Sequence, residues 1–199
     1  VEAEKIGEKL NISSGDGMRV AFRVFDLPIQ VPSDLGSSLY YIGDGFTHLG
    51  ISTSFYMYGK LFDDNRALQT SSQMAESMAT VGLLTQIIKH ITGRVSPNRS
   101  EDGHTDNWTP FPNQIEYHKH VSSYDAFPSG HLAVSMATVT VIAENYPEYK
   151  FIWPLGYTAM LLLGFQMMNN GVHWISDYPL SLAMGYQLGK IAVNNGREK

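Results

Sequence analysis

Apolar side chains recur at helical spacing over much of this 199-residue chain, and this periodicity constrains the fold more than any other feature. In the segment 67–92 they lie three or four positions apart, at Met74, Met78, Val81, Leu84 and Ile88, before Gly93 supplies a stop. The same reasoning predicts helices over 130–145, 151–169 and 178–194. Because no stretch alternates convincingly between polar and apolar residues, the sequence predicts an all-α helical bundle.

The composition fits one domain with a large apolar core. Apolar residues make up 43% of the chain and charged residues 17%, a composition that favours helices that are buried or in contact with a membrane. We expect a single domain over 1–199, with peripheral short helices in 1–64, a core in 65–195 and a long polar loop at 95–127. The net charge of −5 argues against nucleic acid as a partner, and the absence of cysteine excludes thiolate metal sites.

The longest uncharged apolar run, at 151–168, just reaches the length of a membrane-spanning helix. Thr158 and Gln166 dilute the run, and Pro154 belongs in a first helical turn. A buried core helix and a membrane-inserted helix both remain open. We expect an exported, periplasmic or membrane-associated location, with membrane contact; the oligomeric state is left open.

The tetrapeptide Pro128–Ser129–Gly130–His131 stands directly ahead of a predicted helix. A helix N-terminus exposes unpaired N–H groups, and Gly130 lets an anion approach the backbone closely, so a phosphate would fit there. The alternative is that Ser129 is an ordinary helix cap and His131 a surface residue.

Two further stretches carry groups of the same chemistry. His173 and Asp177 lie four residues apart ahead of a helix, and a carboxylate on one ring nitrogen of a histidine makes the other nitrogen a better base or nucleophile. Lys89 and Arg94 lie at the end of the helix over 67–92, where they could face an anion. A buried structural histidine and ordinary helix-ending cations are the alternatives.

Together the three stretches resemble the type 2 phosphatidic acid phosphatase and vanadium haloperoxidase superfamily. Lys89 and Pro97 match its first block, Pro128 to His131 match the second in full, and His173 and Asp177 match the end of the third. The resemblance covers about 65–195 and implies that family's helical fold.

The resemblance also implies a metal-independent hydrolase without a cofactor, acting on a phosphorylated small molecule or lipid. His173 would attack phosphorus and form a phosphohistidine, with Asp177 orienting it. His131 would protonate the leaving oxygen and later activate water. The phosphoryl oxygens would be held by Lys89, Ser129 and Gly130, with Arg94 as a further candidate.

The sequence departs from the family pattern where positive charge is expected. Ser96 replaces the arginine of the first block, and Gln166 and Met167 replace Ser-Arg in the third. Hydrogen bonds to a charged group contribute about 1.5 to 3 kcal/mol each, so two losses would weaken binding or turnover by roughly two to four orders of magnitude. Basic side chains that could compensate are Arg94, Arg99, His90, His118, Lys119 and His120.

Two hypotheses follow from these departures. The first is a phosphatase of weakened or altered activity toward a phosphate ester or diphosphate. The second is a catalytically silent family member that acts as a binding or scaffold protein. A haloperoxidase would also need the missing arginines, and a metal site at Glu116, His118 and His120 would need a strand where we expect a loop.

Overall fold

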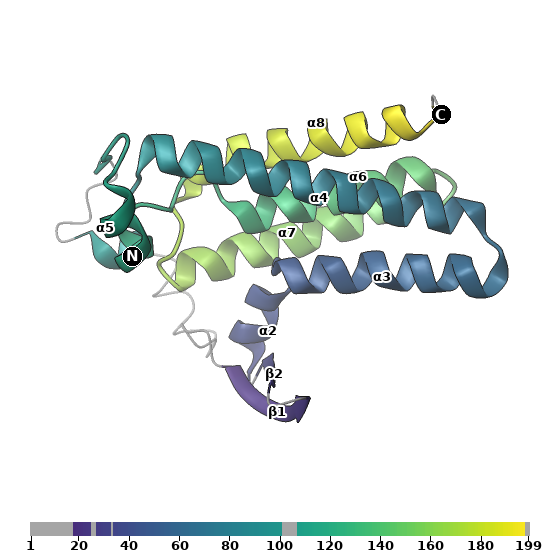
Figure 1. Ribbon diagram of the computed structural model, residues 1–199, viewed down its shortest axis with the longest axis horizontal. Coiled ribbons are helices and arrows are strands. Elements are labelled where there is room, and N and C mark those ends of the chain that lie inside the picture. The colour runs from purple at the N-terminus through teal and green to yellow at the C-terminus, as the bar shows by residue number, and fades with distance from the viewer. Residues whose placement is uncertain (1–17, 25–26, 33, 101–106, 198–199) are drawn as a thin grey trace.

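The computed structural model describes residues 18–24, 27–32, 34–100 and 107–197, and the predicted all-α bundle is confirmed. Its long helices run side by side along one axis (Figure 1). They are α3 (Gly45–Phe62), α4 (Asn65–Thr92), α6 (Gly130–Asn145), α7 (Ile152–Asn169) and α8 (Tyr178–Arg197). Helix α6 lies at the centre, because it contacts each of the other four.

Shorter elements lie at one end and on one side of the bundle (Figure 1). They are the strands β1 (Met18–Val24) and β2 (Leu27–Pro32), the helices α2 (Leu35–Tyr41) and α5 (Gln114–Lys119), and the single turns η1 (Pro97–Arg99), η2 (Val121–Ser123) and η3 (Ile175–Asp177). The strands form an antiparallel hairpin in which Met18 lies opposite Pro32 and Val24 opposite Leu27.

The N-terminal part differs from the peripheral short helices expected over 1–64. The described residues form the hairpin, α2 and the 18-residue helix α3, while 1–17 lie outside the described range. Pro28 and Pro32 argue against a strand at β2 in the sequence, because proline rarely occurs inside a strand. The polar loop expected at 95–127 likewise contains η1, α5 and η2.

Helix α4 has the boundaries that its capping residues dictate. The Asp64 carboxylate accepts a hydrogen bond from the Ala67 N–H at 3.0 Å, which caps the N-terminus. At the other end Gly93 adopts φ +56° and its N–H bonds the Lys89 carbonyl at 2.9 Å. A Cβ at Gly93 would lie 2.0 Å from the Thr109 carbonyl oxygen, so only glycine fits. This stop places Lys89 in the last turn of α4.

Glycines bring α8 against the central helix. A Cβ at Gly185 would lie 2.2 Å from the Ala133 carbonyl oxygen, and one at Gly189 would lie 3.0 Å from that of Ala137. The two helices therefore meet along their backbones. Leu132 and Met136 of α6 also pack with residues of α7 in the largest buried apolar cluster, whose further members are Met160, Leu163 and Met167.

Helix α7, which contains most of the 151–168 run, has two unlike faces. Met160, Leu163 and Met167 are buried in the bundle, whereas Leu155 and Leu161 are 63% and 75% exposed. Across the described ranges, none of the helices is both long and apolar enough to cross a bilayer.

Candidate active site

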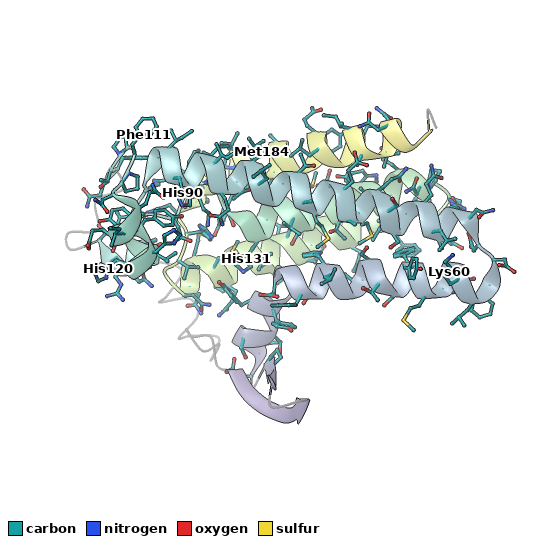
Figure 2. The ribbon with its side chains drawn as sticks, in the orientation of Figure 1. Lys60, His90, Phe111, His120, His131 and Met184 are labelled. Carbon is teal, nitrogen blue, oxygen red and sulfur yellow. The ribbon has the colours of Figure 1, made fainter. Side chains whose placement is uncertain are left out.

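A cavity of about 530 Å³ opens at the end of the bundle where α4 ends and α6 begins. Figure 2 labels His131 further along the bundle and His120 at its end, beside α5. The cavity brings together Lys89, His131 and His173, which are far apart in the sequence. Its other lining residues are Tyr40, Ser96, Arg99, Lys119, His120, Val121, Ser122, Ser123, Asp125 and Val172.

The hydrogen bond of His173 fixes which of its nitrogens carries the proton. Nδ1 lies 2.6 Å from the carbonyl oxygen of Ala126. A carbonyl oxygen can only accept, so Nδ1 donates and Nε2 is left with a lone pair. The ring centroids of His173 and His131 are 6.5 Å apart, with the rings nearly edge to face. The two imidazoles therefore lie side by side, and the Nδ1 of His173 is held by the backbone.

Asp177 has a different principal partner from the one its spacing suggested. It lies fully buried behind His173, with Oδ2 3.5 Å from the His173 Nδ1. The same carboxylate accepts a hydrogen bond from the Trp174 N–H at 2.7 Å and forms an ion pair with Arg94. The nearer partner of His173 is therefore the Ala126 carbonyl, and most of the negative charge of Asp177 faces Arg94.

Arg94 is buried and lies outside the cavity lining, which corrects its candidacy as a phosphate ligand. Its guanidinium stacks on the rings of Trp108 and Trp174, with centroids 4.7 Å and 5.7 Å away. Its carbonyl oxygen accepts a hydrogen bond from the Ala126 N–H at 3.0 Å. Because Ala126 holds His173, Arg94 supports the site from behind rather than facing a ligand.

Lys89 and His131 line the floor of the cavity. The Lys89 ammonium donates to the Asp125 carboxylate at 3.1 Å and is almost buried. Burial, and then the nearby charges of His173, Lys89 and His48, lower the pKa of His131 to about 3. His131 is therefore neutral at pH 7. The ring of Tyr40 packs against it, with centroids 4.7 Å apart.

Ser129 occupies the helix-cap position that the alternative interpretation gave it. Its side chain is fully buried, and its oxygen accepts a long hydrogen bond from the Leu132 N–H at 3.5 Å. The hydroxyl also lies 3.5 Å from the Met167 sulfur. Gly130 borders a smaller cavity of about 230 Å³ that shares Lys89 and His131 with the larger one.

The residues at the positions that depart from the family pattern are all buried, but only one of them lines the cavity. Ser96 belongs to the cavity lining, whereas Gln166 and Met167 lie in α7 outside it. Of the basic side chains considered for compensation, three line the cavity and three do not. Arg99, Lys119 and His120 belong to the first group, and His90, Arg94 and His118 to the second.

The region considered for a metal site is helical rather than extended. Glu116 lies on α5, 3.9 Å from His120 and 3.3 Å from the Lys119 ammonium. Among the residues that the structure describes, no group of three metal-ligating side chains is found.

Sequence reasoning missed three groups that shape the site. Asp125 pairs with Lys89, the Ala126 carbonyl holds His173, and the buried His48 bonds Ser135 at 3.1 Å on the same helix as His131. Asp125 stands three residues before Pro128, and this closeness to the motif could have marked it as a residue of the site. A backbone carbonyl leaves no signal in a sequence.

The protein is a helical bundle in which two neighbouring histidines line one cavity. The family model described as the PAP2 superfamily matches residues 71–198, which is more than half of the chain. The chain belongs to the PAP2 superfamily.

Two relatives of the chain are lipid A 1-phosphatases. The chain is 24% identical over 189 residues to a lipid A 1-phosphatase of Rhizobium etli, a match that covers 85% of this chain and 76% of that protein. It is 28% identical over 104 residues to a lipid A 1-phosphatase of Rhizobium johnstonii, covering 52% of this chain and 38% of that protein. The crystal structure of LpxE from Aquifex aeolicus shares the fold, with a TM-score of 0.53 and 17% identity over 80% of this chain and 83% of that chain.

Proposed function

We propose that this protein is a metal-independent phosphatase that hydrolyses a phosphate ester of a lipid through a phosphohistidine intermediate. The observation that carries the proposal is the hydrogen bond from the His173 Nδ1–H to the Ala126 carbonyl, because it leaves Nε2 as a nucleophile in a cavity with Lys89 and His131. The lipid A 1-phosphatases among the relatives support a phosphorylated lipid as the substrate.

The proposed reaction has two steps on one face of the cavity. The His173 Nε2 attacks phosphorus, the bond to the leaving oxygen breaks, and His131 donates a proton to that oxygen. Neutral His131 then removes a proton from water, which attacks the phosphohistidine and releases phosphate and free His173. The substrate dianion raises the low pKa of His131, so that the proton needed for the first step is bound together with the substrate.

We expect activity to be weakened or altered, because positive charge at the floor of the cavity is sparse. Lys89 supplies an ammonium there, yet it is paired with Asp125, while Ser96 and Met167 supply no charge. The same observation favours a second candidate, a catalytically silent family member that binds a phosphorylated ligand or a partner.

A phosphate-release screen separates the two candidates. Lipid and soluble phosphomonoesters and diphosphates are incubated with the wild type, with His173→Ala, and with His118→Ala as a matched control from outside the cavity. Hydrolysis lost only in His173→Ala, together with a phosphohistidine trapped by rapid acid-free quenching and mass spectrometry, supports the enzyme. Equal background in all three proteins favours the silent member.

We also propose that the protein contacts a membrane. Large apolar side chains are exposed on neighbouring helices, among them Phe46 and Leu61 on α3, Leu83 on α4 and Leu161 on α7. Contiguous exposed apolar surface marks an interaction site, and these side chains are the candidates for such a surface. Co-flotation with liposomes that is lost on Leu61→Gln with Leu161→Gln would support this contact. Export to the periplasm stays a prediction, which fractionation of the native cells tests.

A further inference from the structure

Positive side chains gather at the rim of the cavity, where the proposed chemistry does not use them. Arg99 lies at the end of η1, and Lys119 and His120 lie where α5 passes into η2. All three side chains are exposed, in contrast to the almost buried His173 and Lys89 of the floor. The protein carries a net charge of −5, and the Glu116 carboxylate lies beside both Lys119 and His120, so the excess of positive charge at the rim rests mainly on Arg99.

Hydrogen bonds between η1 and η2 give the rim a defined shape. The Ser96 N–H donates to the Ser122 carbonyl at 3.0 Å, and the Arg99 Nε donates to the Ser122 hydroxyl at 3.3 Å. Lys119 is held from the other side by Glu116 at 3.3 Å. The guanidinium and the ammonium therefore lie in the wall of one cavity rather than on separate flexible loops.

The buried floor and the exposed rim of the cavity offer two separate positions at which a negatively charged group could bind. A phosphoryl group that His173 attacks must lie on the floor, beside Lys89. The rim cations lie at the entrance, so they face the part of a substrate that extends away from the scissile bond. A cavity of about 530 Å³ is larger than a single phosphate needs.

We infer that Arg99, Lys119 and His120 form a second anion subsite, and that the cavity prefers ligands with a second phosphoryl group over ligands with one. This inference rests on the proposed function for the placement of the scissile phosphate. The second group is either joined to the first as a diphosphate or carried elsewhere on the same molecule. The rim thereby supplies part of the attraction that the missing arginines at positions 96 and 167 do not.

Calorimetric titration of the whole protein tests the subsite without relying on turnover. The probes are inorganic phosphate, pyrophosphate, glucose 1-phosphate and glucose 1,6-bisphosphate. The variants are Arg99→Gln with Lys119→Gln, and Lys60→Gln as a control cation at the far end of the bundle (Figure 2). Thermal melting of each variant first establishes that it is folded.

We expect the wild type to bind at least one two-phosphate probe about tenfold more tightly than its one-phosphate counterpart, as two exposed ion pairs allow. This ratio should fall to near one in the double variant and stay unchanged in Lys60→Gln. A preference for pyrophosphate alone indicates a diphosphate ligand, and a preference for the bisphosphate alone indicates separated phosphates. Equal binding of both kinds of probe by the wild type, or an equal change in the control, overturns the inference.

The phosphate-release screen distinguishes this failure from failure of the proposed function. Turnover without a two-phosphate preference leaves the phosphatase standing and removes the subsite. A two-phosphate preference that the double variant abolishes, in a protein that releases no phosphate from any substrate, leaves the subsite standing and removes the phosphatase.

Discussion

Replacing Arg94 by methionine is expected to destabilise the fold by about 3–5 kcal/mol, because it strands the Asp177 carboxylate in the interior. The two side chains are 4% and 0% exposed, so water cannot take the place of the guanidinium. Methionine has a similar length and keeps part of the packing on Trp108. Most of the loss should therefore come from the uncompensated charge.

A double-mutant cycle isolates that charge. Asp177→Asn removes it, so Arg94→Met combined with Asp177→Asn should be more stable than the sum of the single changes predicts, by about 2 kcal/mol. The free energy of unfolding is measured by urea denaturation with linear extrapolation.

The exposed pair Arg66–Glu148 is the matched control for this cycle. Its N–O distance is 2.6 Å, but its side chains are 41% and 48% exposed. Arg66→Met with Glu148→Gln should give a coupling energy below about 1 kcal/mol. Coupling energies that are small and equal in the two cycles would refute the argument that burial makes Asp177 depend on Arg94.

Three further predictions concern pH, the missing arginines and a turn. Burial lowers the pKa of His48 to about 4, so as pH falls the unfolded chain takes up the proton before the folded protein does. The folded state should therefore lose about 3 kcal/mol of stability between pH 6.5 and pH 4. His48→Asn should flatten this pH dependence, measured by urea unfolding. An unchanged slope would contradict this. Position 96 is buried but lines the cavity, so Ser96→Arg should raise phosphate affinity about tenfold. Position 167 is buried outside the cavity lining, so Met167→Arg should lower the melting temperature sharply by burying an unpaired charge. Equal effects at the two positions would count against the cavity geometry. Gly93→Ala should destabilise by more than about 1 kcal/mol in the same urea assay, since its Cβ would collide with a backbone carbonyl at φ +56°, and Gly82→Ala, with open space around its Cβ, should not.

Four of the five long helices could be predicted because their signals are local, whereas α3 lies where only short helices were expected. Asp64 and Gly93 delimit α4, and the apolar spacing between them is visible without any knowledge of tertiary contacts. The hairpin could not be predicted with the same success, although Val20, Phe22 and Val24 alternate with polar or small residues in β1. The prolines of β2 argue locally against a strand, and strand pairing is itself a contact between two segments.

The candidate site could likewise be predicted only in part from the sequence. The resemblance of the three sequence blocks to the family pattern implied that Lys89, His131 and His173 meet, but which groups hold them depends on the surrounding fold. Nothing local distinguishes Arg94, which turns inward to Asp177, from Arg99, which turns to the cavity rim five residues later. Only the tertiary structure decides which arginine faces a ligand.

The backbone contact between α6 and α8 bears on how such a chain can change over evolutionary time. His131 begins α6, and His173 lies just ahead of α8, so the contacts of Gly185 and Gly189 with α6 help to set the spacing of the two imidazoles. Those contacts involve the backbone of α6, and apolar residues elsewhere in the core can be exchanged while the spacing is kept. The charged residues that line the cavity take no part in this helix contact. A substitution among them is therefore expected to leave the distance between the two imidazoles unchanged, whereas a larger residue at either glycine would push the helices apart.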